Sequence, residues 1–76
     1  MNSDPAAQAN ERTARRWQSE IVNLATERLG RSLTAAETIF ITSRLGFIAL
    51  EMIHDTVREA ATADEIEQYL NSESRQ

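Results

Sequence analysis

The residues best suited to chemistry in this sequence are Glu51 and His54, which form a Glu-x-x-His pattern. On a helix this spacing places a carboxylate and an imidazole on adjacent turns, as in the metal-binding helices of di-iron carboxylate bundles. Such a site also needs glutamates that project inward from other helices, but Glu20 and Glu27 lie opposite the apolar stripe of the first predicted helix. We therefore expect a solvated Glu51 and a hydrogen-bonded His54 at the edge of the core, with metal binding as a weaker alternative.

Catalytic groups are scarce. The chain contains no cysteine and no lysine, and His54 is its single histidine. Asp55, beside it in sequence, points about 100° away around a helix, so the two side chains do not form a catalytic pair. Because the usual nucleophile and base combinations are missing, the sequence predicts a protein that is not an enzyme and needs no cofactor.

A basic cluster next to the only tryptophan consists of Arg12, Arg15 and Arg16. Arginine can contact phosphate and an indole can stack on a base. The remainder of the chain opposes such a role: residues 1–33 carry five arginines and four acids, whereas residues 34–76 carry three arginines and eight acids. Since phosphate neutralisation supplies most of the affinity for nucleic acid, we rank nucleic-acid binding below protein binding.

The elements that position these residues are all helical. The apolar spacing predicts helices over residues 5–29, 35–60 and 63–71, followed by a disordered tail at 72–76. Their ends carry recognisable signals. These are an N-cap before proline (Asp4 and Pro5), a left-handed glycine (Gly30) and two capping boxes (Thr34 with Glu37, and Thr62 with Glu65).

The first predicted helix has one apolar stripe, which we expect to cover the second helix. Its members recur at helical spacing: Ala14, Trp17, Ile21, Val22, Leu24, Ala25 and Leu29. Arg28 interrupts this stripe near its end, where an unpaired charge would be costly. We expect Arg28 to extend outward and to pair with Glu37.

The second predicted helix, Thr34 to Ala60, is apolar around most of its circumference, which is more than a single neighbouring helix can cover. One side of this helix carries small residues, so another backbone can approach it closely. Glycine inside a helix lowers helix stability by about 1 kcal/mol, and close packing is a reason for its presence. We therefore expect close packing at Gly46. The predicted dimer or partner interface comprises Thr42, Gly46, Ala49, Ile53, Phe47 and Leu50.

These features predict an all-α fold: an antiparallel helical hairpin plus a short C-terminal helix in one domain over residues 1–76. A chain of this size is marginally stable alone, so we expect a homodimer with a four-helix-bundle-like core. The predicted function is a small non-enzymatic protein–protein interaction module, an adaptor, inhibitor or regulator. We expect a soluble cytoplasmic protein with a protein partner and no membrane contact. The alternatives are a nucleic-acid-binding regulator and a metal-binding helical bundle.

Overall fold

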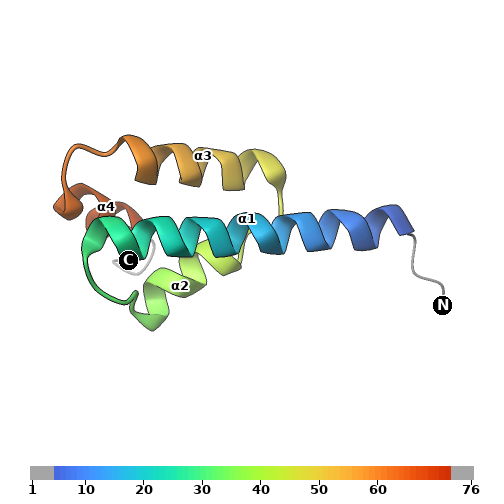
Figure 1. The fold of residues 1–76 in the computed structure, drawn as a ribbon, viewed down its shortest axis with the longest axis horizontal. Helices are drawn as coiled ribbons and strands as arrows, with labels where there is room; N and C mark the ends of the chain where they lie inside the picture. The colour runs from blue at the N-terminus through green and yellow to red at the C-terminus, as the bar shows by residue number, and fades with distance from the viewer. Residues whose placement is uncertain (1–4, 73–76) are drawn as a thin grey trace.

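A computed structural model describes the backbone of residues 5–72 and the side chains of residues 11–72. Within that part the chain forms four α-helices and no strand (Figure 1): α1 (Pro5–Leu29), α2 (Ala35–Thr42), α3 (Phe47–Glu59) and α4 (Ala63–Leu70). The all-helical prediction is confirmed, and α1 and α4 lie where the sequence indicates. The predicted N-cap Asp4 and positions 73–76 of the predicted tail lie outside the described residues.

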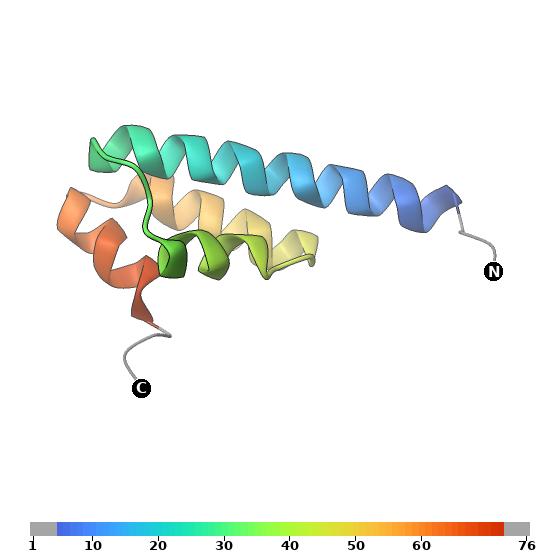
Figure 2. The same ribbon diagram turned by 90° about the horizontal axis from the view of Figure 1, so that it is seen from below.

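The helix α1 is the central element, because it contacts each of the other three helices. Figure 1 and Figure 2 show that α2 runs antiparallel to α1, whereas α3 runs parallel to it. α4 closes the end at which α1 finishes and packs against α1 and α2. The molecule measures 44 × 25 × 20 Å, and its length comes from α1, which extends past the α2–α3 turn (Figure 1).

The predicted continuous helix over residues 35–60 is wrong, because the chain turns at residues 43–46 and separates α2 from α3. Buried Gln18 of α1 accounts for part of this turn: its Nε2 donates to the backbone carbonyls of Thr42 and Arg44. These bonds serve acceptors at a helix C-terminus that have no partner within the helix. Gly46, a poor residue for a helix interior, is instead the N-cap of α3. The predicted pair of long helices is thus replaced by three helices that run down, up and down.

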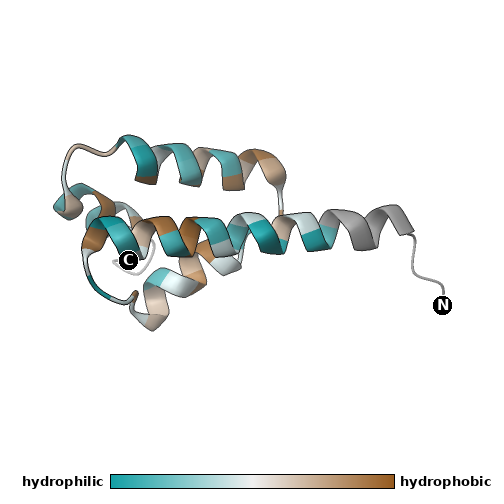
Figure 3. Cartoon of the chain, in the orientation of Figure 1, coloured by the Kyte–Doolittle hydropathy of each residue, from teal (hydrophilic) through white to brown (hydrophobic). Residues whose placement is uncertain are grey.

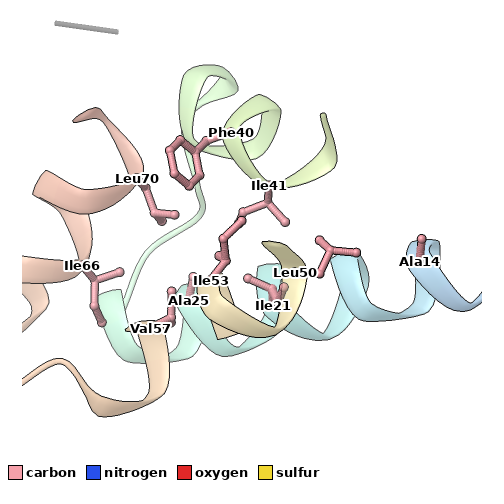
Figure 4. Close-up of a cluster of buried hydrophobic side chains, with 10 residues drawn as sticks. All are labelled: Ala14, Ile21, Ala25, Phe40, Ile41, Leu50, Ile53, Val57, Ile66 and Leu70. Atoms are coloured by element: carbon pink, nitrogen blue, oxygen red, sulfur yellow. The ribbon is translucent and has the colours of Figure 1, made fainter. Parts of the chain in front are cut away.

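The hydrophobic core draws on all four helices and lies between α1 and the other three (Figure 4). Ile21 and Leu50 are fully buried where α1 meets α3, and Leu70 of α4 lies close to Phe40 of α2. Each large side chain buried in this way stabilises the fold by about 1.5–3 kcal/mol. The core residues are Ala14, Ile21, Ala25, Phe40, Ile41, Leu50, Ile53, Val57, Ile66 and Leu70.

The predicted helix ends are confirmed at three places. Gly30 leaves α1 with φ +72°, the left-handed conformation that favours glycine. Thr34 and Glu37 form the reciprocal capping box at the start of α2. At α4 Thr62 is the N-cap as predicted, because its hydroxyl accepts from the Glu65 amide, but the predicted capping box is incomplete. The Glu65 carboxylate accepts from the Ala61 amide at 3.1 Å and not from the Thr62 amide.

Apolar and polar residues alternate around the helices, as the brown and teal bands of α1 in Figure 3 show. This pattern is typical of helices that bury one side against a core. Among the residues that the structure describes, no helix combines the length and the apolar character needed to cross a bilayer.

Candidate interaction surface

The most unusual surface feature is a row of apolar side chains that begins in the α2–α3 turn and continues along α3. Leu45 is 58% exposed, Ile48 77% and Met52 62%, and we call these three residues the α3 row. Ile48 and Met52 are one helical turn apart, so their side chains are neighbours on the outward face. Figure 3 shows this N-terminal end of α3 in brown and tan. The apolar surface of α3 therefore extends beyond what the core can cover.

Two further large hydrophobic side chains are exposed close by in sequence. Phe47, the first residue of α3, is 42% exposed, and Ile39 on the outer side of α2 is 61% exposed. The apolar side chains that α3 does bury, Leu50, Ile53 and Val57, belong to its opposite side. The N-terminal half of α3 is thus apolar on two sides, and among the described residues only the side that faces α1 is covered.

The turn that presents this row is held by contacts to the rest of the molecule. Gln18 of α1 donates to the carbonyls of Thr42 and Arg44, and the Ser43 amide donates to Ile39 O at 2.9 Å. The guanidinium of Arg44 lies 4.6 Å from the centre of the Phe40 ring, in cation–π geometry. These contacts fix the turn, and with it the start of α3.

The residues of the predicted interface are divided between surface and core. Leu50 and Ile53 are buried in the core of the single chain, and Ala49 is half-buried. Thr42, Gly46 and Phe47 are exposed at or beside the turn. A Cβ built on Gly46 would meet no atom within 4 Å, so the expected close packing at this glycine does not occur within the chain. The exposed apolar surface is centred on the α3 row instead.

Glu51 and His54 do not face a common site. Glu51 is exposed, whereas His54 is half-buried with its ring edge-on to Trp17 of α1 at 5.5 Å between centroids. The His54 Nδ1 atom lies 3.6 Å from Asp55 Oδ1, so these two side chains come close to each other, contrary to the prediction from their helical spacing. No group of three or more histidine, cysteine, aspartate or glutamate side chains in the described part of the chain is placed to hold a metal ion. Metal binding stays a prediction, which elemental analysis after metal-supplemented expression tests.

The arginine cluster lies on the solvent side of α1. Arg12, Arg15 and Arg16 are all exposed, and Arg15 Nη2 pairs with Glu11 Oε2 at 2.9 Å. Trp17 packs against the core rather than beside these guanidinium groups in solvent. The structure therefore separates the basic side chains from the aromatic ring that the sequence places next to them.

A buried carboxylate, Glu37, organises the opposite end of the molecule. It is 1% exposed, and Arg31 donates to it through two bonds, Nη1 to Oε1 and Nη2 to Oε2, each 2.9 Å long. The Thr34 amide donates at 2.8 Å and the Asn71 side-chain amide at 2.8 Å. Because Arg31, Thr34 and Asn71 donate to its charged form, the pKa of Glu37 falls from 4.5 to about 2, although burial opposes this shift. The group joins the α1–α2 loop, α2 and the end of α4.

The predicted pairing of Arg28 with Glu37 is wrong. Arg28 Nη1 donates to the backbone carbonyls of Val57 and Arg58, each at 2.8 Å. A cation at this position complements the helix dipole and serves carbonyls near the C-terminus of α3 that lack partners. Arg28 thus fastens the end of α3 to α1, and Arg31 takes the place beside Glu37.

The roles of Gln18 and Arg31 in these contacts were not predicted from the sequence, although the position of each residue indicates them. Gln18 lies between Ala14 and Ile21 at helical spacing, so it sits inside the apolar stripe and needs a polar partner in the core. Arg31 lies six residues before Glu37, across a loop whose path is set by Gly30. A glutamine within the apolar stripe of α1 indicates that the segment packed against it offers a polar partner, here the carbonyls of Thr42 and Arg44.

Comparison of the chain with protein-family models, with curated proteins and with solved structures finds no match.

Proposed function

We propose that this chain is a small non-enzymatic interaction module that regulates, inhibits or links other proteins through the α3 row. The observation that carries the proposal is the exposure of Leu45, Ile48 and Met52, each by more than half, on a framework fixed by α1. The largest apolar patch on a soluble protein is often a functional surface.

The surroundings of the row supply polar docking surface. Residues 34–76 carry eight acids against three arginines, and the exposed acids Glu51 and Glu59 lie on α3 itself. Charges at the rim of an apolar contact set the specificity and the rate of association more than the affinity. The proposed partner is a protein, which includes a second copy of the chain, and the proposed setting is the cytoplasm.

The test compares proteins captured from the native host by the wild type and by Ile48→Glu. Ile39→Glu is the matched control, because it changes the same residue type at similar exposure on α2. We expect a wild-type partner that Ile48→Glu loses and Ile39→Glu keeps, and that binds the purified chain directly. Circular dichroism verifies the helical fold of each variant. Capture that is unchanged by Ile48→Glu would contradict the proposal.

Nucleic-acid binding is the second candidate, favoured by the exposure of all three side chains Arg12, Arg15 and Arg16. A gel shift that weakens as salt rises would be lost in the triple alanine variant if these arginines neutralise phosphates. Arg58→Ala is the control, since it removes an exposed arginine that pairs with acids on α3. No shift by the wild type at low salt would dismiss this candidate.

A further inference from the structure

The outward face of α3 changes character along its length. Leu45, Ile48 and Met52 continue at helical spacing into Asp55 and Glu59, with intervals of three, four, three and four residues. Within α3 these intervals place Ile48, Met52, Asp55 and Glu59 on one line along the helix surface, and Leu45 lies just before the helix, in the α2–α3 turn. The line is therefore apolar in its N-terminal half and acidic in its C-terminal half.

We propose, building on the proposed function, that a second copy of this chain covers the α3 row, with the two α3 helices antiparallel and overlapping through their N-terminal halves. In this arrangement Ile48 packs against Met52 of the second copy, and the contact repeats about a two-fold axis near residue 50. Closed two-fold contacts are the commonest form of self-association, because one surface serves both copies.

The charges favour this partner and this orientation. Antiparallel overlap brings Asp55 and Glu59 of one copy beside the α2–α3 turn of the other. The only charged side chain of this turn is Arg44, which in its own chain stacks on Phe40 and donates to Ser43 Oγ. α3 also begins without a capping side chain or an acid in its first turn, so the acids of the second copy would complement its positive dipole end. A parallel pair would instead set Asp55 against Asp55 and Glu59 against Glu59, and like charges this close repel.

The area of the row sets the expected strength. Leu45, Ile48 and Met52 together expose on the order of 400 Å² of apolar surface per copy, about half of what each partner buries in a standard interface. We therefore expect a reversible dimer with a dissociation constant of about 1–100 µM. Small domains commonly gain stability from such contacts, since their own core is limited.

The first test is sedimentation equilibrium of the purified full chain from about 0.5 to about 500 µM, a range that brackets the expected dissociation constant. We expect dimer formation by the wild type, at least a tenfold weaker association of Ile48→Glu, and wild-type association of Ile39→Glu. A wild type that stays monomeric throughout overturns the inference, as does equal weakening by both variants.

The second test fixes the orientation, using the absence of cysteine from the chain. Ile48→Cys and Met52→Cys proteins are mixed and treated with a short bis-maleimide linker, which we expect to join the two variants. Glu59→Cys alone should not be joined, because 18 residues of helix rise separate the two positions by about 27 Å. Efficient linking of Glu59→Cys to itself would show a parallel pair and overturn the proposed arrangement.

Failure of this inference and failure of the proposed function give different results. If the wild type is monomeric but captures a protein that Ile48→Glu does not capture, the proposed interaction function is supported and the proposed second copy is wrong. If Ile48→Glu changes neither self-association nor capture, both proposals are wrong.

Discussion

The two ends of the part that all four helices form differ in which side chains they bury. Where α1 finishes, the carboxylate of Glu37 is buried and receives four hydrogen bonds from Arg31, Thr34 and Asn71. At the α2–α3 turn, large apolar side chains such as Leu45 and Ile48 remain in solvent. Burial of the Glu37 charge costs desolvation free energy. The apolar side chains at the turn stay exposed, although burial of such side chains is what normally drives folding.

The first region contributes to the stability of the folded chain, whereas the second is available for association with a partner. The four hydrogen bonds at Glu37 join three segments of the chain, so their loss weakens the fold itself. The α3 row adds little to the stability of one chain, because its side chains are exposed both when the chain is folded and when it is unfolded. Substitutions at the first end should therefore change unfolding, and substitutions at the second should change binding.

The largest expected effect contrasts neighbouring positions on opposite sides of α3. Leu50→Ala empties a fully buried site and should lower the free energy of unfolding by about 2–5 kcal/mol. Met52→Ala, at an exposed site, should change it by less than about 0.5 kcal/mol. Urea denaturation at one low protein concentration measures both, because association would make the midpoint depend on concentration. Similar losses in the two variants would break the contrast between the sides of α3.

Glu37→Gln should destabilise the chain by about 2 kcal/mol, because it removes the charge that Arg31 and the Thr34 amide both bind. The matched control is Glu67→Gln. Glu67 is exposed and lies 3.8 Å from the same arginine, so its change should cost less than about 0.5 kcal/mol. Thermal unfolding followed by circular dichroism compares the two. A cost at Glu67 as large as that at Glu37 would refute the role of burial.

The same carboxylate predicts a dependence on pH. Its pKa is lowered from 4.5 to about 2 on folding, so the unfolded chain takes up its proton first as the pH falls. The stabilisation from Glu37 is therefore fully present above about pH 5 and is lost progressively as the pH falls through 4.5 towards 2. The stability difference between wild type and Glu37→Gln should shrink across this window, and urea titrations at several pH values measure it. A constant difference would rule out the linkage.

Gln18→Ala tests how the turn is held and should cost about 1 kcal/mol. The substitution removes the donor to the carbonyls of Thr42 and Arg44, and water reaches this exposed turn and compensates in part. Gln68→Ala, on the exposed side of α4, is the control and should be near neutral. Equal stability of the two variants would show that the hydrogen bonds of Gln18 contribute nothing to the turn.

The sequence predicts much of this structure where the signals are local. Gly30, Thr34 and Glu37 fix the helix ends through bonds between residues close in the chain, and those predictions are confirmed. The break between α2 and α3 depends instead on Gln18, 24 residues before Thr42. Apolar periodicity continues through the turn and does not reveal it, because Ile41, Leu45 and Ile48 keep helical spacing in the sequence across residues 43–46.

The smallest effect concerns Gly46, where the sequence indicated close packing and the structure has an open N-cap. Its φ of −75° and ψ of 134° suit any L-residue, so Gly46→Ser needs no backbone change. The serine oxygen can accept an amide at the start of α3, which should stabilise the chain by a few tenths of a kcal/mol. Gly46→Ala offers the same Cβ without an acceptor and should not share this gain. If another backbone packed against Gly46, both substitutions would destabilise the chain by a similar amount. Equal losses of stability for Gly46→Ser and Gly46→Ala in urea titrations would therefore indicate close packing at Gly46 and contradict this prediction.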